Sequence, residues 1–178
     1  MRRKLIYLHL LFAGFMAPAF LLLAISGGGY LAGFKGETAD SALSLPAGAT
    51  LDFEADTLEA DVRDLLERAG IDHDFEYIRN RGTRIELRPT SRTYIAFAQT
   101  PDGLRATRHV PNLQKSMVEL HKGHGPRLFK RYQQVVSLVL IGVVLGGVLV
   151  GLLSRVWRRP TLVAMAVGTV VFFVLALL

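Results

Sequence analysis

The sequence contains no cysteine among its 178 residues. This absence excludes disulfide bonds, thiolate metal sites and thiol nucleophiles. The chain also lacks a glycine-rich phosphate-binding loop, a flavin or dinucleotide fingerprint, and a recognisable Ser-His-Asp arrangement. We therefore expect no catalytic residues and no enzymatic activity from this chain acting alone.

Formal charge is missing from three long stretches, residues 5–31, 135–153 and 161–178. A helix rises about 1.5 Å per residue, so about 20 apolar residues cover the roughly 30 Å hydrocarbon core of a bilayer. Each uncharged stretch is close to this length or longer. The sequence thus predicts an α-helical membrane protein with three transmembrane helices. These helices are expected to contact the lipid bilayer.

These stretches divide the chain into five segments. The first uncharged run is longer than the roughly 7 to 15 apolar residues of a cleavable signal peptide, so we expect an uncleaved anchor that Pro18 kinks. We predict a cytoplasmic tip and first transmembrane helix at residues 1–31, an exterior domain with its linker and returning helix at 32–134, a second transmembrane helix at 135–153, a cytoplasmic turn at 154–160, and a third transmembrane helix at 161–178.

The basic residues indicate the orientation. The net charge of +6 equals the charge of six residues at two short tips: Arg2, Arg3, Lys4, Arg155, Arg158 and Arg159. Short cytoplasmic loops are enriched in lysine and arginine, which places these tips inside and residues 32–134 in the periplasm of a bacterial inner-membrane protein. Five bases before the second span, on its expected exterior side, do not follow this rule: Lys115, Lys122, Arg127, Lys130 and Arg131. Long loops, however, are translocated largely regardless of their charge.

The remaining charges do not favour a nucleic-acid partner. Once the two tips are set aside, fifteen bases balance fifteen acids. The basic excess is therefore a signal of membrane topology, and we predict no nucleic-acid binding.

The exterior segment has the pattern of a small α+β domain. Residues 33–50 are rich in Gly, Ala and Ser and indicate a linker. Helical spacing from Leu58 to Ala69 predicts an amphipathic helix, with Asp56 as its cap. Alternation of period two then predicts an antiparallel meander on which this helix packs, and Asn112 is expected to cap a second helix. The solvent face of the meander is expected to carry charges: Glu76, Arg84, Glu86, Arg88 and Arg92.

Both ends of this domain carry a recurrent pattern. His9 precedes a leucine-rich run and a glycine cluster, and the glycine-rich second span is entered through LHKGHG at residues 120–125. This pattern resembles the PepSY-associated transmembrane proteins. The resemblance implies an accessory or regulatory role, because PepSY domains are associated with binding or restraining proteins outside the membrane. Larger members of that family have more spans, and in some of them histidines are thought to bind haem.

His121 and His124 are the candidates for such a metal or haem site. Three residues apart, they can share a helical face, but Gly123, Gly125 and Pro126 disfavour a rigid helix there. We expect them to anchor the helix end at the interface, and the alternatives to that role are metal or haem binding and contact with a partner. His9 belongs to the opposite end of the first span and cannot serve the same haem, and His73 and His109 are expected in solvent. We predict no cofactor, with a haem b redox subunit as the alternative.

Two pairs of glycines in the second span are spaced four apart. Gly142 pairs with Gly146, and Gly147 pairs with Gly151. Small residues at this spacing let another helix approach closely. The neighbour is either another span of this chain or a partner, which is a second membrane protein or a second copy of this chain.

Overall fold

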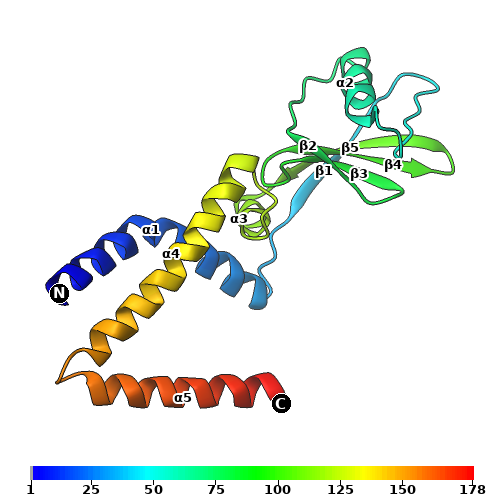
Figure 1. Ribbon diagram of the computed structural model, residues 1–178. Helices are drawn as coiled ribbons and strands as arrows, with labels where there is room; N and C mark the ends of the chain where they lie inside the picture. Colours follow the sequence, from blue (N-terminus) through cyan, green and yellow to red (C-terminus); the bar gives the residue numbers. More distant parts are fainter. Residues whose placement is uncertain (1) are drawn as a thin grey trace. The chain divides into compact units, whose positions relative to one another are not determined.

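The structure, a computed structural model, describes residues 2–178 without the side chain of Arg2 (Figure 1). Met1, the first residue of the expected cytoplasmic tip, lies outside the described part. The chain forms two compact units, which we call the helical unit, α1 through Phe20 with Gln134–Leu178, and the sheet unit, Leu21–Gln133. The elements are α1 (Arg2–Leu31), β1 (Thr38–Leu43), α2 (Leu58–Arg68), β2 (Tyr77–Asn80), β3 (Arg84–Arg88), β4 (Tyr94–Thr100), β5 (Gly103–Pro111), α3 (Leu113–His121), α4 (Arg127–Leu152) and α5 (Arg158–Leu177).

Within residues 2–178, the helices α1, α4 and α5 are long and apolar enough to cross a membrane, which suggests membrane association. The three apolar helices predicted from the uncharged runs are thus confirmed. α4 begins at Arg127, so the basic segment before the second uncharged run is already helical. Pro160 lies in the first turn of α5, where a missing backbone N–H costs nothing.

The five strands form one antiparallel sheet in the order β1-β5-β4-β3-β2. The consecutive neighbours β2 to β5 confirm the predicted meander. The linker prediction was wrong in part, because Thr38–Leu43 pairs with β5 from Thr38↔Pro111 to Leu43↔Ala106. Local composition conceals this strand, since its backbone hydrogen bonds are made with residues far along the chain.

The helix α2 covers one face of the sheet (Figure 1). Its apolar stripe includes Val62 and Leu65, which are fully buried together with Phe97 of β4. The apolar spacing therefore predicted the buried face correctly. Asp56 is not the cap, however: Thr57 occupies that position and makes no side-chain capping bond, because its hydroxyl donates to Asp61 instead.

The opposite face of the sheet corrects two expectations about exposure. Arg88 was expected in solvent but is 3% exposed, and His109 is 6% exposed. The Nδ1 atom of His109 lies 2.6 Å from Asp40 Oδ1, and its ring stacks on Tyr94 at 4.7 Å between centroids. Asp40 belongs to β1, so the strand that composition conceals supplies the partner that lets His109 be buried.

Candidate functional site

His121 lies at the end of α3 and meets the last turns of α1. Its Nδ1 atom is 2.9 Å from the hydroxyl oxygen of Ser26, which is fully buried. A Cβ atom at Gly27 would lie 3.1 Å from Cε1 of the same ring, so glycine is what permits this close approach. His121 thus helps to join α1 to α3 within the sheet unit.

His124 lies beyond the end of α3 and has a different partner. Gly123 takes a positive φ of 73° and the helix ends before it, as expected from the glycine-rich sequence. The Nδ1 atom of His124 lies 2.7 Å from Glu119 Oε2, and its carbonyl accepts from the backbone N–H of Thr90. The two candidate histidines therefore do not share a helical face.

Glu119 is the centre of a buried polar network. Its Oε2 atom accepts a hydrogen bond from Thr90 at 2.8 Å in addition to the contact with His124. The hydroxyl of Thr90 accepts from Arg88 at 2.9 Å, and Arg88 donates to Glu86 at 2.8 Å. We call these five residues the Glu119 network. It runs from β3 to the segment that leads into α4, so the sheet and that segment are joined by buried hydrogen bonds.

The electrostatics of this network favour an ionised Glu119. Lys115 and Lys122 place their Nζ atoms 3.5 and 3.7 Å from Glu119 Oε1. Burial by itself raises the pKa of Glu119, but hydrogen bonds from His124 and Thr90 and the charges of His124 and Lys115 outweigh it. The net pKa of Glu119 is therefore below its ordinary value.

Three of the four glycines of α4 face side chains of this chain's own helices, since a Cβ at Gly146 would lie 3.8 Å from His9 Nδ1. A Cβ at Gly147 would lie 3.3 Å from His9 Cε1, and one at Gly151 would collide with Thr161. A Cβ at Gly142 meets nothing within 4 Å. The packing of a partner helix on these glycines stays a prediction.

A groove runs between α1 and α4 in the helical unit. Its volume is about 240 Å³ and its walls include Leu8, Phe12 and Gly146 as well as Gly142. The Nδ1 atom of His9 is buried and has no hydrogen-bond partner among the described residues. The groove offers an apolar surface of the size of one or two side chains.

Sequence reasoning missed the buried residues that tie the sheet unit together. Ser26 sits in an otherwise apolar helix, and Thr90 follows a strand that periodicity marks as half-exposed. The available local signals are the spacings of Lys115 and Lys122 from Glu119, which suit ion pairs on one helix. Those spacings do not reveal the contacts of Glu119 with Thr90 and His124, which depend on the fold.

The arrangement also bears on metal and haem binding. Among residues 2–178, no group of three or more His, Asp or Glu side chains is placed to hold a metal ion. Both candidate histidines use Nδ1 for a hydrogen bond, which leaves Nε2 as the atom that a single axial bond to haem iron would need.

Comparison with known proteins gives no family assignment: no protein-family model, no curated protein and no solved structure matches this chain.

Proposed function

We propose that this protein is an accessory or regulatory protein of the bacterial inner membrane that has no catalytic activity of its own. Its domain at residues 32–134 lies in the periplasm and binds or supports a partner protein. The three apolar helices support the membrane placement, and the resemblance to PepSY-associated proteins supports the role.

The observation that carries this proposal is the Glu119 network. Buried polar groups that hydrogen-bond to one another favour one arrangement of the elements that they join. Here they join β3 to α3 and to His124, which lies shortly before the start of α4. A protein that binds the sheet can therefore act on the beginning of a candidate transmembrane helix, as a regulatory subunit requires.

The membrane part of the partner packs on α4 around Gly142. A Cβ there meets no atom of this chain within 4 Å, so a larger side chain at this position enters the open groove between α1 and α4 and does not collide with the neighbouring helix at its Cβ. Gly147 is a poorer probe, because a side chain there would press on His9. Gly168 of α5 is a matched control, since a Cβ at that position also meets open space.

We expect the tagged full-length protein, solubilised in mild detergent, to purify with a second membrane protein or a second copy of itself in fixed stoichiometry. Gly142→Leu should reduce the amount of partner by about tenfold, because a bulky side chain prevents close helix approach. Gly168→Leu should retain the partner. A wild-type protein that purifies alone as a monomer, or equal yields from both variants, would contradict the proposal.

A second candidate function is a redox subunit that binds haem through His121 or His124. The hydrogen bonds at Nδ1 favour it, because an imidazole ligand is commonly oriented in this way by its second nitrogen. We expect a haem protein to show a visible absorption band that shifts on reduction and weakens in His121→Ala or His124→Ala, but not in His73→Ala. A colourless preparation from haem-replete cells would eliminate this candidate.

A further inference from the structure

Two cations gather on one tyrosine ring at the end of α1. The Nζ atoms of Lys35 and Lys122 lie 5.5 and 5.6 Å from the centre of the Tyr30 ring. An aromatic ring at this distance attracts an ammonium group through its negative face. We call these three residues the Tyr30 cluster.

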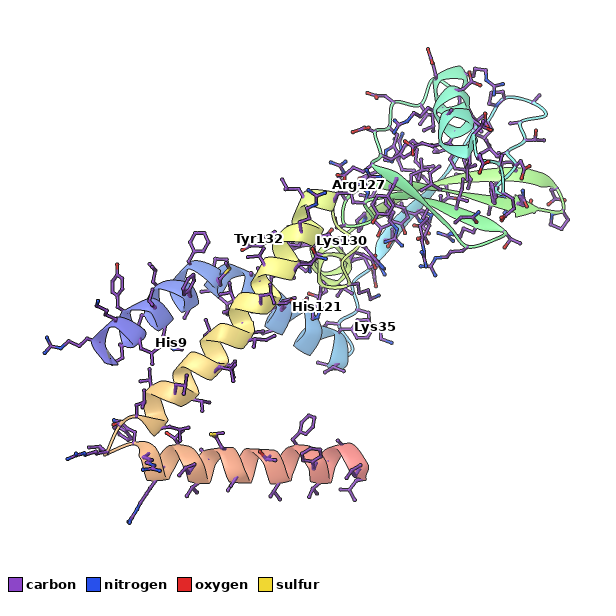
Figure 2. All side chains as sticks on the ribbon, in the orientation of Figure 1. His9, Lys35, His121, Arg127, Lys130 and Tyr132 are labelled. Atoms are coloured by element: carbon purple, nitrogen blue, oxygen red, sulfur yellow. The ribbon has the colours of Figure 1, made fainter. Side chains whose placement is uncertain are left out.

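The same arrangement recurs at the start of α4. The guanidinium carbon of Arg127 and the Nζ atom of Lys130 lie 5.4 and 5.5 Å from the centre of the Tyr77 ring. We call this group the Tyr77 cluster. Both clusters lie within the sheet unit, the first at the end of α1 and the second at the start of α4, and Figure 2 shows Lys35, Arg127 and Lys130 in these positions.

The cations of both clusters are poorly neutralised. Lys35, Arg127 and Lys130 form no ion pair within the described part of the chain, whereas Lys122 lies 3.7 Å from Glu119, which it shares with Lys115. Glu76 accepts from the backbone N–H of Arg127 rather than from its guanidinium group. Both clusters therefore present excess positive charge, and Lys35, Lys122, Arg127 and Lys130 are solvent-exposed.

Apolar surface adjoins the Tyr30 cluster. A pocket of about 260 Å³ is lined by Tyr30, Leu31, Val118 and Lys122, among others. Leu31 and Phe34, the large apolar residues that come after Tyr30 in the sequence, are 88% and 70% exposed. An ammonium group beside exposed apolar and aromatic side chains is the combination found where a transmembrane helix enters the headgroup layer.

We propose that the Tyr30 and Tyr77 clusters bind the phosphates of anionic phospholipids in the leaflet that faces the sheet unit. The ammonium and guanidinium groups contact the lipid phosphate, the tyrosine rings lie at the level of the glycerol, and the pocket beside Tyr30 takes the first part of an acyl chain. This role accounts for basic residues on the side of the second span that the topology rule disfavours. The proposal uses the membrane assignment of α1 and α4 and is independent of a partner protein.

The test is lipid binding by the full-length protein, delipidated in a non-ionic detergent and titrated with phosphatidylglycerol or with phosphatidylcholine of the same acyl chains. We expect native mass spectrometry to show preferential binding of phosphatidylglycerol. Removing one pair of cations, in Lys35→Gln/Lys122→Gln or Arg127→Gln/Lys130→Gln, should weaken that binding roughly thirty-fold, since each base near an anionic surface contributes about a factor of five.

Two kinds of control separate binding from folding and from net charge. Arg79→Gln/Arg92→Gln removes the same charge from two exposed arginines outside both clusters and should leave binding within about twofold of wild type. Lys35→Arg/Lys122→Arg keeps the charge and should retain the preference. Equal binding of both lipids, equal losses in cluster and control variants, or complete competition by millimolar inorganic phosphate would overturn the proposal.

Discussion

Replacing Glu119 with alanine is expected to destabilise the protein by about 3 kcal/mol, because a buried network then loses its central acceptor. Thr90 and His124 are left without their shared carboxylate oxygen. Arg88, which is only 3% exposed, also loses the second carboxylate near its guanidinium group, 3.9 Å away. Urea or thermal unfolding of the full-length protein in detergent measures the loss.

The control for this variant is Glu67→Ala, which removes an exposed carboxylate from α2. It should change the free energy of unfolding by no more than about 0.5 kcal/mol. If both alanine variants unfolded alike, the Glu119 network would contribute nothing to stability. The proposed link between the sheet and α4 would then lose its physical basis.

The contribution of Glu119 should also depend on pH. Its pKa is lowered in the folded protein, so its stabilising effect is fully present above the ordinary pKa of a glutamate. The effect is lost as the pH falls through the lower pKa of the folded state, because the carboxylate of Glu119 is then protonated and loses its charge interactions with His124 and Lys115. The stability difference between wild type and Glu119→Gln should therefore shrink on acidification below about pH 4, as unfolding curves at several pH values would show.

Replacing Phe97 with alanine should cost about 4 kcal/mol, the range expected when a fully buried aromatic side chain leaves a cavity. Phe97 is 0% exposed and packs among the apolar residues between α2 and the sheet. The resulting fall in stability is measured by the same unfolding experiment. It should be accompanied by faster proteolysis within the sheet unit, because the core that holds α2 is weakened.

Leu113→Ala provides the comparison for Phe97→Ala. Leu113 is also a large apolar residue, but it begins α3 and is 77% exposed. Its truncation should change the free energy of unfolding by less than about 0.5 kcal/mol. Similar losses in the two variants would show that the core is not where the structure places it.

Much of the fold could be predicted from neighbouring residues alone. Uncharged runs identified the three apolar helices. The thickness of a bilayer and the rise per residue set the length of a spanning helix, and the local composition shows which segments are apolar over that length. Helical spacing identified the buried stripe of α2, and period-two alternation identified β3, β4 and β5. The cap at Asn112 is confirmed too, since its side chain accepts from the backbone N–H of Lys115.

The candidate site was less predictable. The sequence singled out His121 and His124 by their spacing. In the structure, His121 forms a hydrogen bond with Ser26, whereas His124 forms one with Glu119. The partner of His121 lies 95 residues away along the chain, so no local pattern contains it. The glycine pairs were visible in the sequence, but which of them meet His9 or Thr161 depends on helix packing.

The sequence by itself determined where this chain is apolar enough for lipid and which of its segments become helix or meander, since those properties depend on residues a few positions apart. Only the tertiary structure decided that β1 completes the sheet and that Arg88, His109 and Glu119 are buried with partners. The physical reason is that a charged side chain is buried only where another part of the chain supplies its countercharge or hydrogen bond. That complement is brought to it by folding.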